Sequence, residues 1–170
     1  MTFTDMLTED IQRLRAAEQE QLKTLPQMAE SASGEGLQNS IREHLAQTHL
    51  QIRRLETVLE QMGAKPAPAA CKAAEGLRDD AMDLLGRDTD DEVIDLEIIA
   101  AGQKTEHFEI ACYSSAIEMC QALGMDQAVS LLRESLSEEQ ESSRILAQAA
   151  KPLLRTVAEM EMEEVEVENE

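Results

Sequence analysis

The chain has 170 residues, which is enough for one domain with a substantial core, and only 2% of them are aromatic. Its formal net charge of −20, from 35 acidic and 15 basic residues, argues against nucleic acid and membrane surfaces as partners. Ala, Leu, Glu and Gln dominate and favour helices over strands, so we expect an all-α protein.

Four segments have the periodicity of amphipathic helices, and Gly, Pro or Asp interrupts the sequence between them. Pro26 falls inside the first segment and is expected to kink that helix or end it early. A short fifth helix is expected within residues 71–86, in the connection of ~27 residues between the second and third long helices. The long helices are predicted to span roughly residues 5–30, 36–62, 90–123 and 126–157.

Two short turns and one long connection predict two antiparallel hairpins joined by a crossover, a standard topology of four-helix bundles. We expect the bundle to occupy residues 1–155 and the acidic segment 156–170 to be a flexible tail. Three cysteines without metal-binding spacing, and an N-terminus without an apolar signal segment, predict a cytoplasmic protein with reduced thiols.

The inward seam of each long helix, read in alternating steps of three and four residues, is apolar at both ends and polar in its middle. On the third long helix, Gln103 and Glu106 lie on this seam between Ile99 and Ile110. Counted from the turns, the polar middles lie at similar heights, so we expect them to form one layer inside the bundle. Glu18, Glu106 and Glu139 would meet in this layer. Glu109, one turn from Glu106, would add a second oxygen ligand, and His44 is displaced from this level by about four residues, or ~6 Å.

Buried carboxylates that repel one another need protonation or a bound cation, and no Lys or Arg lies on the four seams to offset them. Carboxylates together with imidazole suit iron, manganese or zinc. Alternatively, these polar residues only fix the register of the helices, or a rotation of the helices carries them to the surface. Tyr113, one turn beyond Glu109, is expected to be a buried aromatic with a paired hydroxyl, and it could hydrogen-bond a ligand carboxylate.

Five blocks of sequence, in their order and spacing, carry a family resemblance. They read "AAEQEQLKTLPQMAESA", "EHLAQTHLQIRRLETVLEQMGAKP", "CKAAEGL", "QKTEHFEIACY" and "LLRESLSEEQ". Together they resemble the YciE/YciF family of ferritin-like proteins over nearly the whole chain except the acidic tail. The resemblance implies a dimeric, stress-associated bacterial protein with a ferritin-like bundle and a di-metal centre. It implies Glu18, His44, Glu106, Glu109 and Glu139 as ligands, with His107 beside them or on the surface.

Two positions depart from the family's pattern. Gln47 stands where family members usually have a carboxylate, and Ser143 stands where they tend to have an aspartate. Both are weaker ligands than the carboxylates they replace. A single metal, a looser pair of metals, or a site that has lost its metal are the alternatives.

Two functions follow as competing hypotheses. The first is a stress-response protein that binds iron or manganese, as one or two ions, with a redox role such as oxygen or peroxide reduction. Its reaction and substrate are not indicated by the sequence. The second is a non-enzymatic homodimer that binds an unknown protein partner and whose degraded site holds no metal.

Overall fold

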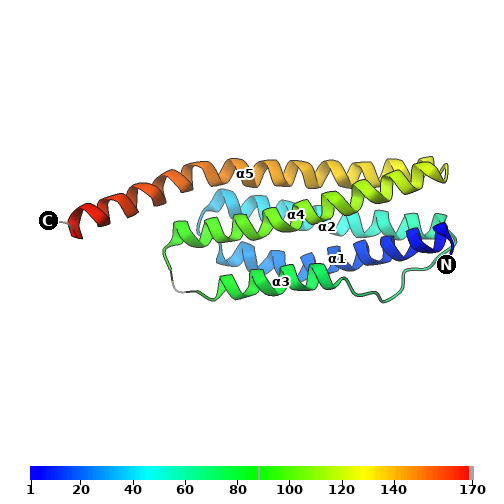
Figure 1. Ribbon diagram of the computed structural model, residues 1–170, viewed down its shortest axis with the longest axis horizontal. Helices are drawn as coiled ribbons and strands as arrows, with labels where there is room; N and C mark the ends of the chain where they lie inside the picture. The colour runs from blue at the N-terminus through cyan, green and yellow to red at the C-terminus, as the bar shows by residue number, and fades with distance from the viewer. Residues whose placement is uncertain (88, 169–170) are drawn as a thin grey trace.

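The computed structural model describes residues 1–87 and 89–168, and for residues 163–168 it describes the backbone alone. All the secondary structure in this part of the chain is helical, which confirms the all-α prediction. Four long helices form the expected bundle, and one short helix lies in the crossover connection (Figure 1). The helices are α1 (Phe3–Ser31), α2 (Glu35–Gln61), α3 (Lys72–Leu85), α4 (Asp91–Ala122) and α5 (Asp126–Glu168).

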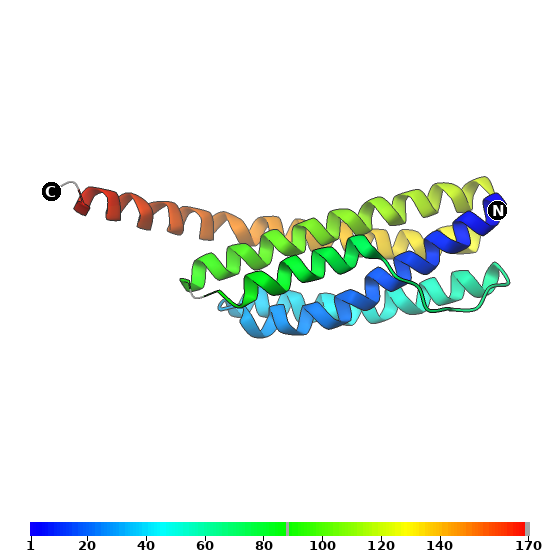
Figure 2. The ribbon, with the colours of Figure 1, turned by 60° about the horizontal axis from the view of Figure 1, so that its bottom comes forward.

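The bundle consists of two helical hairpins that pack against each other. Helix α1 packs most extensively against α2, and α4 against α5, while contacts of α2 with α5 and of α1 with α4 close the bundle. The short helix α3 packs against both α1 and α4, so it covers the outside of the groove between them (Figures 1 and 2). This arrangement is the hairpin–crossover–hairpin topology that the loop lengths predict.

Local sequence signals set the ends of the helices. Thr2 caps α1 by accepting a hydrogen bond from the backbone N–H of Asp5, whose carboxylate accepts one from the N–H of Thr2 in return. Gly63 and Gly124, with φ of 73° and 69°, occupy the left-handed region just after α2 and α4. The expected early end at Pro26 is wrong, because α1 continues past it to Ser31.

The core is divided by the polar layer. One apolar cluster, which includes Leu7, Ile11 and Leu132, fills the end of the bundle near the α4–α5 turn. A second cluster, which includes Leu25 and Ile98, fills the other end. The two clusters hold the helices together on both sides, and the polar side chains between them therefore have fixed surroundings.

Helix α5 differs most from the prediction. It continues to Glu168 instead of ending near residue 157, because Ala, Glu and Met favour helix and no glycine interrupts the segment. Its C-terminal part projects beyond the other helices (Figures 1 and 2). Residues 169–170 of the expected tail lie outside the described residues, and flexibility of the tail stays a prediction. Among the described helices, none is both long and apolar enough to cross a bilayer.

Candidate metal centre

All four long helices contribute ionisable side chains to the polar layer. Glu18 comes from α1, His44 from α2, Glu106 and Glu109 from α4, and Glu139 from α5. All five side chains are buried, with exposed fractions between 0% and 3%. The alternative in which rotation of the helices carries them to the surface is therefore excluded.

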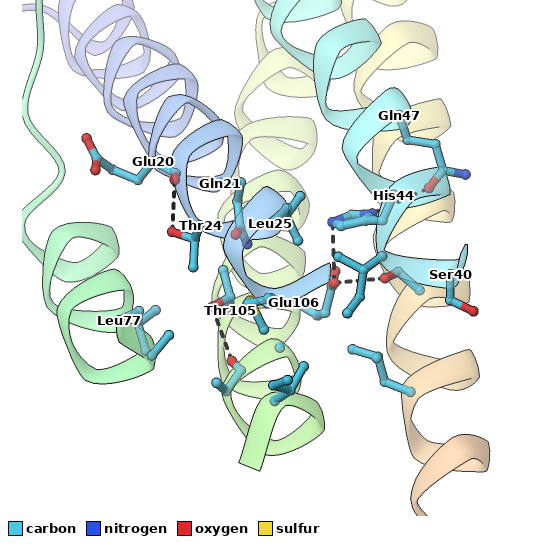
Figure 3. A pocket seen from close by; sticks show the side chains of 18 of the residues that line it. Glu20, Gln21, Thr24, Leu25, Ser40, His44, Gln47, Leu77, Thr105 and Glu106 are labelled. Atoms are coloured by element: carbon cyan, nitrogen blue, oxygen red, sulfur yellow. Dashed lines mark hydrogen bonds and ion pairs between the residues drawn. The ribbon is translucent and has the colours of Figure 1, made fainter. Parts of the chain in front are cut away.

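Four of these side chains converge on one point. His44, Glu106, Glu109 and Glu139 each offer one donor atom, and these atoms lie within 4.8 Å of one another. The Nε2 atom of His44 is 3.3 Å from Oε1 of Glu106 and 3.8 Å from Oε2 of Glu139. Figure 3 shows His44 and Glu106 facing each other. Donors bound to one ion at about 2.0–2.2 Å lie up to about 4.4 Å apart, so small movements would suffice to surround an ion.

Glu18 lies at the edge of this group. Its Oε1 atom accepts a hydrogen bond of 2.5 Å from the hydroxyl of Tyr113, which is fully buried. Burial is the main cause that raises the pKa of Glu18, and the charge of Glu106 raises it further, as expected for neighbours within one layer. Tyr113 is thus both the buried aromatic and the hydrogen-bond donor that the sequence suggested.

Polar neighbours fix the orientation of His44 and Glu106. The Nδ1 atom of His44 lies 3.4 Å from Oε1 of Gln47, and with its proton on Nδ1 the ring leaves Nε2 free to bind a cation. The hydroxyl of Ser142 donates a hydrogen bond of 2.8 Å to Oε1 of Glu106. Gln47 therefore holds His44 through the ring nitrogen that does not face Glu106, and Ser142 holds the carboxylate oxygen of Glu106 that lies nearest His44.

Two glutamine amides orient the carboxylates of Glu139 and Glu109, each through a hydrogen bond to one carboxylate oxygen. Gln51 donates to Oε1 of Glu139 and, at 3.0 Å, to Oε2 of Glu138. Gln21 donates to Oε2 of Glu109 over 3.4 Å. These amides orient the carboxylates without supplying a positive charge, so they leave the charge of the glutamates uncompensated.

Every candidate ligand keeps one buried atom unpaired. Among the described residues, the buried side-chain atoms without a hydrogen-bond partner include one from each of the five candidates, although the second polar atom of each has one. They are Oε2 of Glu18, Nε2 of His44, Oε2 of Glu106, Oε1 of Glu109 and Oε2 of Glu139. A buried polar atom without a partner lowers the stability of the fold, because its lost contact with water is not replaced. A cation among these atoms would supply the missing interaction. The donor set therefore fits a metal ion.

Burial changes the acidity of these carboxyl groups. It raises the pKa of Glu18 to about 8, although the hydrogen bond from Tyr113 acts in the opposite direction. Burial, together with the charges of neighbouring glutamates, raises the pKa of Glu109 and of Glu139 well above the ordinary value. Without a bound cation, the layer therefore retains protons near neutral pH.

Other polar residues of the seams lie away from the donor atoms. The hydroxyl of Ser143 donates to Oε1 of Gln103 over 2.8 Å, and the amide of Gln103 donates back to the carbonyl of Ser143, so these two residues satisfy each other. His107 is exposed, with Nδ1 2.8 Å from the carbonyl oxygen of Gln103. Sequence reasoning missed Ser142, whose only signal was its position three residues after Glu139.

Comparison with known proteins places the chain in a family. A model of the family described as domain of unknown function DUF892 matches residues 2–159. The chain is 34% identical to Protein YciF of Escherichia coli strain K12 over 139 residues, which are 81% of this chain and 84% of YciF. The crystal structure of the E. coli stress protein YciF matches with a TM-score of 0.88 and 32% identity, over 91% of this chain and 98% of YciF.

Two further structures extend the comparison. YcfI from Rhodopseudomonas palustris matches with a TM-score of 0.83 and 35% identity, over 86% of this chain and 94% of that one. A ferritin-like, diiron-carboxylate protein from Bacillus anthracis matches with a TM-score of 0.69 over 89% of this chain and 100% of that one. At 15% identity, this last likeness shows the ferritin-like fold alone. The chain therefore belongs to the DUF892 family, as a ferritin-like relative of YciF.

Proposed function

We propose that the protein binds one or two divalent ions of iron or manganese in the polar layer of its bundle. One observation carries this proposal: four buried side chains from three helices bring one donor atom each within 4.8 Å of one another, and each of these side chains has a buried atom without a hydrogen-bond partner among the described residues. A cation supplies the missing interaction to all of them at once. The similarity to YciF, which is described as a stress protein, supports a stress-response role.

The charge of the layer limits the number of ions. Four ionised glutamates carry four negative charges, which two divalent cations balance. A single divalent cation leaves two charges, and protons retained on glutamates with raised pKa values can neutralise these. Carboxylate oxygens with one imidazole nitrogen are a donor set that iron and manganese accept.

Bound iron or manganese would supply one-electron redox chemistry, and we propose a redox role, such as oxygen or peroxide reduction, on that basis. The residues of the chain hold the donors and exclude bulk water. Gln47 directs Nε2 of His44 to the centre, and Tyr113 holds Glu18. We further propose, from the family resemblance, that the protein is a cytoplasmic homodimer. Light scattering would measure its mass in solution and so test the dimer.

Partner binding by a metal-free protein is the second candidate function. The positions of Gln47 and Ser143 favour it, because Gln47 lies at Nδ1 of His44 and Ser143 pairs with Gln103. Neither residue adds a donor to the centre, so only five candidate ligands remain. A homodimer that acts through a protein partner needs no metal in this layer.

Metal analysis of protein purified without chelators separates the two functions. We expect one to two iron or manganese ions per chain, and a higher melting temperature when Fe(II) or Mn(II) is added to metal-free protein. A Glu18→Gln/Glu139→Gln variant should stay folded and lose the metal. A metal content near zero, with melting unchanged by either ion, would support the partner-binding function instead.

A matched control comes from the same helix as Glu139. Glu141 is exposed and pairs with Arg144 on the surface, so Glu141→Gln removes a carboxylate of α5 that does not face the centre. This variant should bind as much metal as the wild type. An equal loss of metal in Glu141→Gln would mean that total acidic charge, and not the buried centre, attracts the ions.

A further inference from the structure

A cavity lies directly beside the candidate metal centre. All five helices contribute to its wall, and His44 and Glu106 form part of that wall (Figure 3). Its volume is about 60 Å³. One water-sized position takes roughly 10–15 Å³, so the cavity holds roughly four to six such positions. A molecule of a few non-hydrogen atoms therefore fits without movement of the helices.

The wall is mostly apolar away from the centre. Leu25 and Met28 of α1 and Leu146 of α5 are buried side chains that line it. The two threonines of the wall turn their hydroxyl groups back to their own helices: Thr24 donates to the carbonyl of Glu20 at 3.0 Å and Thr105 to that of Ala101 at 3.3 Å (Figure 3). The charged side chains Glu43 and Glu141, which also line the cavity, are exposed, so the buried part of the wall away from His44 and Glu106 is mainly apolar and fits a neutral ligand better.

The crossover helix α3 completes the wall between α1 and α4. Ala74, Leu77 and Ala81 of α3 line the cavity, and Ala74 and Ala81 are buried. Arg78 pairs through Nη1 with Glu20, which ties α3 to α1 at the edge of the cavity. The short helix therefore separates the cavity from solvent on this side.

Gly102 keeps the cavity open from the α4 side. It lies in the middle of a long helix, where glycine is the least favourable residue after proline. A Cβ atom at this position would lie 2.8 Å from Cδ1 of Leu146 and 4.0 Å from Cε of Met28. Any side chain there would push Leu146 aside or take up space inside the cavity.

We propose that this cavity binds a small neutral molecule of a few non-hydrogen atoms and holds it against His44 and Glu106. Gly102 determines the size of the ligand, and α3 retains it. The claim that the cavity presents a ligand to a metal rests on the proposed function. The claim that the cavity binds a small apolar molecule is independent of it, because the apolar wall is present without any ion.

Xenon is a suitable probe, since it is neutral, apolar and occupies cavities of this kind. Metal-free wild-type crystals under xenon pressure should show an anomalous peak between Leu25, Met28 and Leu146. Two variants that fill the cavity from different helices, Gly102→Ala and Ala81→Leu, should each lose most of this occupancy. Gly76→Ala is the matched control, because it adds the same methyl group in α3 where no atom lies within 4 Å.

Absence of xenon from the wild-type cavity, or equal occupancy in the wild type and in whichever filled variants fold, would overturn the proposal. Metal content measured on wild-type protein purified without chelators, before the metal is removed for the xenon crystals, distinguishes this failure from failure of the proposed function. If xenon binds but the purified protein contains no metal, the cavity remains a binding site and the metal function is contradicted. If the protein contains metal but xenon does not bind, the metal function remains and the cavity proposal is overturned.

Discussion

Tyr113 donates its hydroxyl hydrogen to Oε1 of Glu18 over 2.5 Å, and both side chains are fully buried. No other hydrogen bond to the carboxylate of Glu18 occurs in the described part of the chain, and its Oε2 atom has no partner there. One aromatic residue of α4 therefore decides how the carboxylate of α1 is presented to the centre.

Tyr113→Phe removes this hydrogen bond and keeps the ring that fills the core. We expect metal affinity to fall about 10- to 100-fold, the usual effect of losing a partner that orients a ligand. Competition with a metal indicator would measure the change. In a Glu18→Gln background the same substitution should have a much smaller effect, because Tyr113 acts through that carboxylate. Equal effects in both backgrounds would contradict this role.

The raised pKa of Glu18 predicts how the stability of the metal-free protein depends on pH. Its pKa is about 8 in the folded protein, mainly because of burial, against an ordinary value of 4.5. The folded state therefore binds this proton more tightly than the unfolded state does. The resulting stabilisation is complete below pH 4.5 and is lost as the pH rises through 8. The melting temperature in chelator should therefore fall between pH 5 and pH 8.

Glu18→Gln supplies the comparison for this pH dependence, because an amide does not titrate. The fall in melting temperature should be smaller in this variant than in the wild type, while Glu141→Gln, at an exposed position, should follow the wild type. Saturating metal should flatten the wild-type profile, since a cation replaces the protons. Identical profiles for the wild type and Glu18→Gln would show that Glu18 does not titrate in this range.

Gln47 offers a substitution that should strengthen the centre. Its Oε1 atom lies 3.4 Å from Nδ1 of His44. In Gln47→Glu a carboxylate would accept the Nδ1 proton more strongly and make Nε2 a better donor to a metal. We expect tighter metal binding than in the wild type, and weaker binding in Gln47→Ala, both measured by calorimetry. The opposite order of the two variants would mean that Gln47 does not act through His44.

The polar layer was predictable because its residue types conflict with their positions. A carboxylate such as Glu106 on the inward seam is visible in the sequence, and the short turns set the heights of the four helices. The partners of these groups were less predictable. The seam assigned Ser143 to the interior, yet its neighbour Ser142 contacts Glu106, because a step of one residue turns a helix by about 100°. Such rotations depend on packing between helices, which no single helix encodes.

The cavity and the end of α5 were beyond the sequence for different reasons. The cavity depends on where α3 docks, and the sequence predicted that helix without its neighbours. The helix beyond residue 157 was missed because its acidic charge favours a disordered tail, whereas the intrinsic helix propensity of Glu, Met and Ala acts in the opposite direction. Pro26 was misjudged because apolar residues beyond it, such as Met28, pack in the core and hold α1 together.

Asp95 is a structural residue that the seam analysis did not identify. From α4 it accepts hydrogen bonds from the backbone N–H groups of Ser33 (2.7 Å) and Gly34 (2.9 Å), at the start of α2. It thereby fixes, from another helix, the backbone of the turn between α1 and α2, because both N–H groups precede the first residue of α2. Asp95→Ala should lower the free energy of unfolding by about 1–3 kcal/mol, because it leaves backbone donors unpaired.

Urea denaturation of metal-free protein would measure the effect of Asp95→Ala. Asp83→Ala is the control, since Asp83 is exposed on α3 and makes no side-chain hydrogen bond among the described residues. It should change stability by less than about 0.5 kcal/mol. Metal stoichiometry should be the same in both variants, because Asp95 lies outside the polar layer. If the folded Asp95→Ala variant lost metal, the hydrogen bonds of Asp95 would have to affect the geometry of the metal centre as well.

Removal of residues 156–170 tests whether the projecting end of α5 belongs to the bundle. Nearly all the described side chains beyond Arg155 are exposed, whereas the second apolar cluster extends along α5 only as far as Leu153. Truncation after Arg155 should therefore leave the melting temperature and the metal content close to those of the wild type, since exposed residues contribute little to stability. A matched truncation after Ala149 removes Leu153 as well and should lower the melting temperature. If truncation after Arg155 alone lowered the melting temperature, the end of α5 would have to pack against another surface, such as a second copy of the chain. The mass in solution checks this directly: the full-length protein would then exceed the truncated one by more than the mass of the deleted residues.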